Sequence, residues 1–86
     1  MIVRIPGEGQ YRVDGAVLEE MKALDERISA QVAAADEAGF RGSLSEILEL
    51  VRRRGSRLDD ASLQESDLIL PHGDMTLAEA RQLFET

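Results

Sequence analysis

Two runs of apolar residues follow helical spacing but differ in phase, and this difference constrains the fold most. The first run recurs every three or four residues from Val17 to Ala35, and the second extends from Phe40 to Val51. Continued at its own step, the first run would reach Gly39, so the second is displaced by one residue, or about 100° around a helix. One straight helix would therefore need two different buried faces. The sequence predicts two helices with a break between them.

Capping residues predict where these helices begin and end. Asp14 can accept hydrogen bonds from the first turn of a helix over about Gly15 to Ala35. Asp36 can cap a second helix over about Glu37 to Arg54, which Gly55 would end. The short connection makes the two helices an antiparallel pair.

A second start for the later helix is also encoded. Ser43 and Glu46 have the spacing of a capping box, which would begin the helix only at Leu44. Phe40 is in phase with Leu44 and favours the longer helix, although Gly39 and Gly42 would each cost that helix up to about 1 kcal/mol relative to Ala.

The N-terminal segment predicts a β-hairpin. β-forming residues at Ile2–Ile5 and Tyr11–Val13 flank a turn at Pro6–Gly9. Because an isolated hairpin is marginal in water, it must pack on helices, recruit a third strand or pair with another chain.

The C-terminal third is polar until Leu68, Ile69 and Leu70, where Asp67 to Pro71 fits either a short third strand or a tight helical turn. Thr76 and Glu79 form a capping box that opens a short final helix, Leu77 to Glu85. The predicted fold is α+β in one domain, residues 1–86: an N-terminal hairpin packed on an antiparallel pair of long helices, followed by a short C-terminal helix. The predicted core consists of the residues that are in phase within their elements: Val3, Ile5, Met21, Leu24, Ile28, Phe40, Leu44, Leu48, Val51 and Leu83.

Composition excludes several classes of function. The chain has no Cys and one His, His72, which removes disulfides, thiolate metal sites and multi-histidine zinc sites. A net charge of -7 opposes attraction to nucleic acid, so no direct nucleic-acid partner is predicted. The longest apolar run, Val32–Ala35, is far too short to span a bilayer and no leader pattern is present, so we expect a cytoplasmic protein. No cofactor is predicted.

Two groups of residues are candidates for binding a partner. The first is the arginine cluster, Arg52, Arg53, Arg54 and Arg57, which either complements the C-terminal end of a helix dipole or docks an acidic partner helix or anionic lipid headgroups. The second is Leu68, Ile69 and Leu70, which is either core or an exposed protein-binding edge. A small chain with an unpaired hairpin edge is expected to associate, with itself or with a partner, through this edge or through Leu68 to Leu70.

His72 is the remaining candidate for chemistry. It lies near Asp67 and Asp74 in the sequence, and a carboxylate could orient its imidazole for base catalysis or metal ligation. No nucleophile motif accompanies it, and such residues after Pro71 are typical of a surface turn.

The order of these segments resembles a known family. The opening segment Met1 to Val13, MIVRIPGEGQYRV, is similar to the start of the PspA-associated protein family, PspAA. Further matching segments follow in the same order over all 86 residues: Phe40, Leu48 to Arg52, Gly55, Leu58, Ser66 to Pro71 and Thr76 to Glu79.

The resemblance implies a non-enzymatic accessory or regulatory protein of the phage-shock (envelope-stress) response. Such a protein would act by contact with PspA, the coiled-coil protein that coats stressed membranes, or with other phage-shock proteins, and would reach the membrane only through a partner. No catalytic residue is implied. The alternatives are a small hydrolase or metal-dependent enzyme centred on His72, and a transcriptional regulator, which the net charge disfavours.

Overall fold

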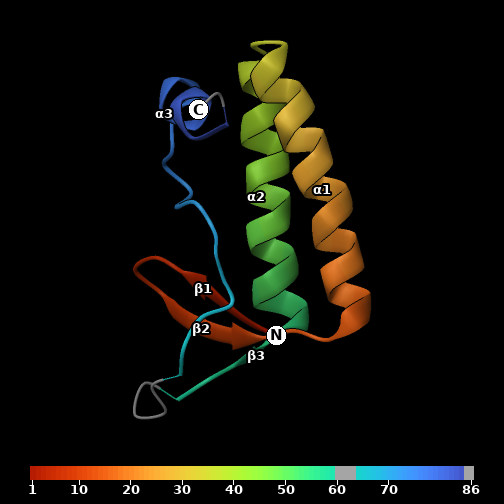
Figure 1. Ribbon diagram of the computed structural model, residues 1–86, viewed down its shortest axis with the longest axis vertical. Coiled ribbons are helices and arrows are strands. Elements are labelled where there is room, and N and C mark those ends of the chain that lie inside the picture. The colour runs from red at the N-terminus through yellow and green to blue at the C-terminus, as the bar shows by residue number, and fades with distance from the viewer. Residues whose placement is uncertain (60–63, 85–86) are drawn as a thin grey trace.

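The structure, a computed structural model, describes residues 1–59 and 64–84, without the side chains of residues 83 and 84. Two long helices, α1 (Gly15–Ala33) and α2 (Glu37–Arg54), lie side by side and antiparallel (Figure 1). The short helix α3 (Leu77–Phe84) lies toward the end of the pair where α1 turns into α2, and the sheet lies toward the other end.

The sheet has four short strands in the order β3-β2-β1-β4. β1 (Ile2–Ile5) and β2 (Gly9–Arg12) form the antiparallel hairpin, β3 (Ser56–Arg57) pairs antiparallel with β2, and β4 (Leu68–Ile69) pairs parallel with β1. The predicted α+β class is confirmed, and the segment after Asp67 is a strand rather than a helical turn. β3 was not predicted.

The caps define the helical pair as the sequence indicates. The Asp14 carboxylate accepts from the Val17 amide at 2.9 Å, and the Asp36 carboxylate accepts from the Gly39 amide at 3.0 Å. α2 begins at Glu37, so the alternative start at Leu44 is wrong.

The first helix ends two residues before the predicted end at Ala35. Ala35 has a φ of 56°, in the left-handed region that ends a helix, and its amide donates to the Val32 carbonyl at 3.1 Å. The last residue of the apolar run is thus used to turn the chain toward α2.

Gly55 ends α2 for a steric reason. Its φ is -82°, which any residue can adopt, but a Cβ at this position would lie 2.6 Å from the Val51 carbonyl oxygen and 3.2 Å from the Tyr11 Cβ. A Cβ here would therefore clash with the backbone of the last turn of α2 and press against Tyr11 of β2, so this position favours glycine.

One core joins both helices to one face of the sheet. Every predicted core residue whose side chain is described is buried, while the side chain of Leu83 lies outside the described part of the chain. The other buried apolar side chains are Ile2, Tyr11, Val13, Val17, Val32, Ile47, Leu50, Leu70 and Ala80.

Ile2 breaks the alternation of burial along its strand, and the residues just before β4 contact this part of the sheet. Between β3 and β4 the chain must cross from one edge of the sheet to the other. Gln10 donates to the Ser66 hydroxyl at 2.8 Å, and the Ile2 amide donates to the Asp67 carboxylate at 2.8 Å. Ile2 itself is 8% exposed.

Candidate partner-binding surface

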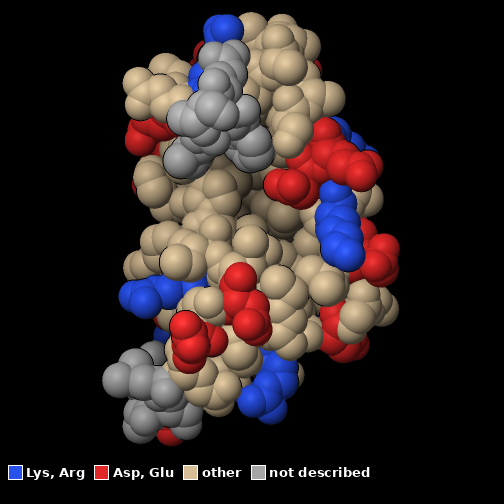
Figure 2. All heavy atoms as spheres, viewed as in Figure 1, with Lys and Arg blue, Asp and Glu red and all other residues tan. Residues whose placement is uncertain are grey.

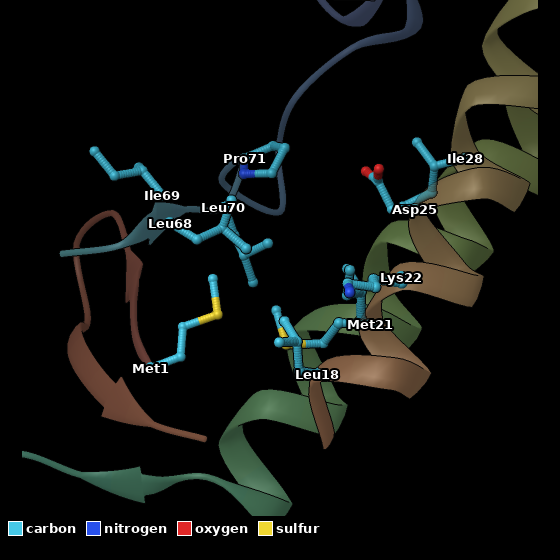
Figure 3. Close-up of a pocket in the computed structure, with 11 residues that line it drawn as sticks. Met1, Leu18, Met21, Lys22, Asp25, Ile28, Leu68, Ile69, Leu70 and Pro71 are labelled. Carbon is cyan, nitrogen blue, oxygen red and sulfur yellow. The ribbon is translucent and has the colours of Figure 1, made fainter. Parts of the chain in front are cut away.

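A groove with a volume of about 400 Å³ runs between α1 and the β4 edge. Its lining is mostly apolar, and α2 contributes Ile47 to it. Figure 3 shows the lining residues on the two sides of the opening. Met1, Leu68, Ile69, Leu70 and Pro71 lie on one side, and Leu18, Met21, Lys22, Asp25 and Ile28 of α1 lie on the other. Figure 2 shows an uncharged surface across the middle of this face, with charged side chains, most of them acidic, along α1.

The α1 wall is one face of a helix. Met21 and Ile28 are buried and belong to the core as well, whereas Leu18 is half-buried, and Lys22 and Asp25 are exposed at the rim. Spacings of three and four residues place these side chains in one row. Leu18 directly follows Val17 of the buried stripe and is not needed for it. An apolar residue at this position is the signal in the sequence that could have indicated the α1 wall of the groove.

The β4 wall separates the three apolar candidates of the sequence. Leu68 is paired with Val3 and is 36% exposed, Ile69 is paired with Arg4 and is 63% exposed, and Leu70 is 6% exposed and belongs to the core. Ile69 extends away from α1 (Figure 3). The segment is thus partly core and partly exposed edge.

Exposed apolar side chains gather at this groove. Among the residues that the structure describes, the large apolar side chains classed as exposed are Met1, Leu68 and Ile69, and all of them line it. Single apolar residues on a surface need no explanation, but several exposed apolar side chains beside one groove are typical of an interaction site.

The first arginine of the cluster is held by contacts within the chain. The Arg52 guanidinium lies 2.7 Å from one carboxylate oxygen of Glu8, and it also pairs with Glu49 at 2.9 Å. Hydrogen bonding to Arg52 holds the pKa of the Glu8 carboxyl below its usual value, with the positive charges of Arg52 and Arg57 adding to the effect. Arg52 thereby ties α2 to the hairpin turn.

Two more arginines also have partners within the chain. Arg54 forms an ion pair with Glu20 of α1, and Arg57 donates to the Glu8 backbone carbonyl at 2.9 Å. Arg53 is exposed, and no ion pair to it is found among residues 1–59 and 64–84. The four arginines therefore do not form one freely available basic patch.

His72 lies in the turn before α3. Its backbone carbonyl accepts from the Met75 amide at 3.1 Å, and the predicted capping box follows, with the Glu79 amide donating to the Thr76 hydroxyl at 3.1 Å. The Thr76 amide and then its hydroxyl lower the pKa of the Glu79 carboxyl, with a smaller contribution from His72. No group of three or more potential metal ligands is found in the described part of the chain.

None of the described helices is both long enough and apolar enough to cross a bilayer.

Comparison with family models shows which family the chain resembles over its length. The model of a family described as PspAA, PspA-Associated protein, matches residues 1–86. No curated protein and no solved structure matches the chain significantly. The resemblance seen in the opening segment is therefore confirmed over the length of the chain.

Proposed function

The chain belongs to the PspA-associated protein family, and from this premise we propose that it is a non-enzymatic accessory or regulatory protein of the PspA membrane-stress response. It acts by direct contact with PspA or with another phage-shock protein. The family name supports the association with PspA, and the contact surface is argued from the groove.

The observation that carries this proposal is the exposed apolar group around the groove. Ile69 and Leu68 are 63% and 36% exposed, although the same short segment supplies Leu70 to the core. A partner that covered Met1, Leu68 and Ile69 would remove this apolar surface from water, which is worth roughly 25 cal/mol per Å² before the costs of association.

Recruitment to a membrane is proposed to be indirect. An arginine near an anionic bilayer contributes about 1 kcal/mol, so the cluster would contribute at most about 4 kcal/mol. Three of its members already have partners within the chain, and the net charge of -7 opposes approach to the bilayer. The protein would therefore be cytoplasmic and reach the membrane surface through PspA.

The direct test measures binding of this protein to PspA of the same organism by isothermal titration calorimetry. Ile69→Asp should weaken binding at least tenfold, since it places a charge in an apolar contact. The matched control is Ala38→Asp, at an exposed position of α2 outside the groove. No binding of the unaltered protein to PspA, or equal affinities for both variants, would contradict the proposal.

A second test separates the two routes to the membrane. Sedimentation with anionic liposomes should recover this protein only when PspA is present. Strong salt-sensitive binding of the purified protein alone would show direct membrane contact instead. Light scattering of the purified protein shows whether it forms a homo-oligomer.

A further inference from the structure

We infer that the groove between α1 and β4 receives an amphipathic α-helix that carries a basic side chain opposite Asp25. This inference rests on the proposed function, since it specifies the chemistry of the partner segment that the groove would bind.

The length of the groove fits a helix. Its α1 wall runs from Leu18 to Ile28, and ten residues at 1.5 Å each span about 15 Å. A helix laid along this wall would contact it over nearly three turns, presenting apolar anchors at the spacings i, i+3 or i+4, and i+7. The apolar side chains on the opposite wall, Leu68 and Leu70, supply the second side of that contact.

The β4 edge is too short to favour an added strand. β4 comprises only Leu68–Ile69. The next residue, Leu70, already donates its amide to the Arg4 carbonyl at 2.9 Å, and Pro71 has no amide hydrogen to donate. An extended peptide would therefore gain few backbone hydrogen bonds here. A helix forms its backbone hydrogen bonds internally, so it can bind through apolar side chains alone.

The charges at the rim of the groove favour a basic side chain on the bound segment. The groove lining contains one basic side chain, Lys22, and one acidic side chain, Asp25. Lys22 has a carboxylate within 3.7 Å, that of Glu19, whereas Asp25 has no ion pair among residues 1–59 and 64–84. The net charge of -7 adds a long-range attraction for a basic segment. A Lys or Arg beside the apolar anchors of the bound helix would meet Asp25.

The test uses two synthetic helical peptides that share one leucine stripe and differ in a single flanking residue, Lys or Glu. Fluorescence anisotropy measures their affinities for the unaltered protein, for Asp25→Lys and for Glu26→Lys. Glu26 is the matched control, because it is exposed, adjacent and outside the lining. Circular dichroism confirms that both variants keep their helical content.

The Lys peptide should bind the unaltered protein about three- to tenfold more tightly than the Glu peptide, as expected for a rim ion pair replaced by a like-charge contact. Asp25→Lys should invert this preference, and Glu26→Lys should leave its direction unchanged. Equal affinities for the two peptides, an inversion by Glu26→Lys as well, or failure of both peptides to bind would overturn the inference. Binding of the dye ANS without any peptide binding would assign the groove to a small apolar ligand and would also overturn it.

The peptide result is independent of PspA. If PspA binds but the peptides show no dependence on Asp25, the inference fails and the proposed function stands. If the peptides behave as expected but PspA does not bind, the proposed function fails.

Discussion

The arginine cluster and the β4 edge are equally conspicuous in the sequence, yet the structure treats them in opposite ways. Arg52, Arg54 and Arg57 have partners within the chain. In contrast, Leu68 and Ile69 remain exposed beside an apolar groove. Three of the arginines connect elements of the fold to one another. Leu68 and Ile69 instead present apolar surface that a partner could bury.

This difference shows that a candidate interface is better judged by which side chains stay exposed without a partner in the folded chain than by which residues lie close together in the sequence. A guanidinium paired with a carboxylate has already lost part of its attraction for a second anion, and exposed ion pairs contribute only about 0.2–1 kcal/mol. The exposed apolar area of Leu68 and Ile69 has no comparable partner among residues 1–59 and 64–84. The β4 edge is therefore the stronger candidate of the two.

The largest expected effect on stability distinguishes Ile69 of β4 from the next residue, Leu70. Leu70 is 6% exposed and Ile69 is 63% exposed. Leu70→Ala should lower the free energy of unfolding by about 2–5 kcal/mol, because it removes buried methyl groups. Ile69→Ala should change it by less than about 0.5 kcal/mol. Urea denaturation checks both, and equal losses for the two variants would show that the edge is ordinary core.

The fold was largely predictable because its signals are local. Asp14, Asp36 and the Thr76–Glu79 box act within one helical turn, and the phase slip between the two apolar runs is visible without any tertiary contact. β3 was missed because Ser56–Arg57 carries no alternation, so only its neighbour β2 makes it a strand. Ala35 was misplaced because the left-handed turn uses an alanine, which gives no sequence signal for a positive φ.

The candidate site was only half predictable. Leu68 to Leu70 was recognised as either core or edge, and the structure shows it to be both. The α1 wall was missed, since Leu18 and Asp25 meet β4 only through the tertiary fold. The partners of the arginines were missed for the same reason: Glu8 lies 44 residues from Arg52, and Glu20 lies 34 residues from Arg54.

A smaller effect concerns the ion pair between Arg52 and Glu8. Since Arg52 lowers the pKa of Glu8 in the folded protein, the pair stabilises the fold above the unfolded-state pKa of about 4.3 and loses that contribution as the pH falls through the lower folded-state pKa. Glu8→Gln should therefore cost about 0.2–1 kcal/mol near pH 7, and the difference from the unaltered protein should be smaller at an acidic pH below the folded-state pKa of Glu8. Urea denaturation at both pH values measures this. Glu26→Gln, at an exposed residue, is the control, and a cost for Glu8→Gln that does not change with pH would contradict the assignment.

An effect of similar size is expected within the arginine cluster, where neighbouring residues differ in their contacts. Arg54 pairs with Glu20, whereas Arg53 is exposed without an ion pair in the described part of the chain. Arg54→Glu should lower the free energy of unfolding, by about 0.2–1 kcal/mol for the lost pair and somewhat more for the new repulsion with Glu20. Arg53→Glu should leave stability unchanged within about 0.5 kcal/mol.

If the cluster also faces acidic residues of PspA, Arg53→Glu should weaken PspA binding about two- to fivefold and flatten its dependence on salt. Calorimetric titrations at low and high salt test this. An unchanged affinity for Arg53→Glu, together with a loss for Ile69→Asp, would assign binding to the apolar edge and leave the arginines a structural role alone.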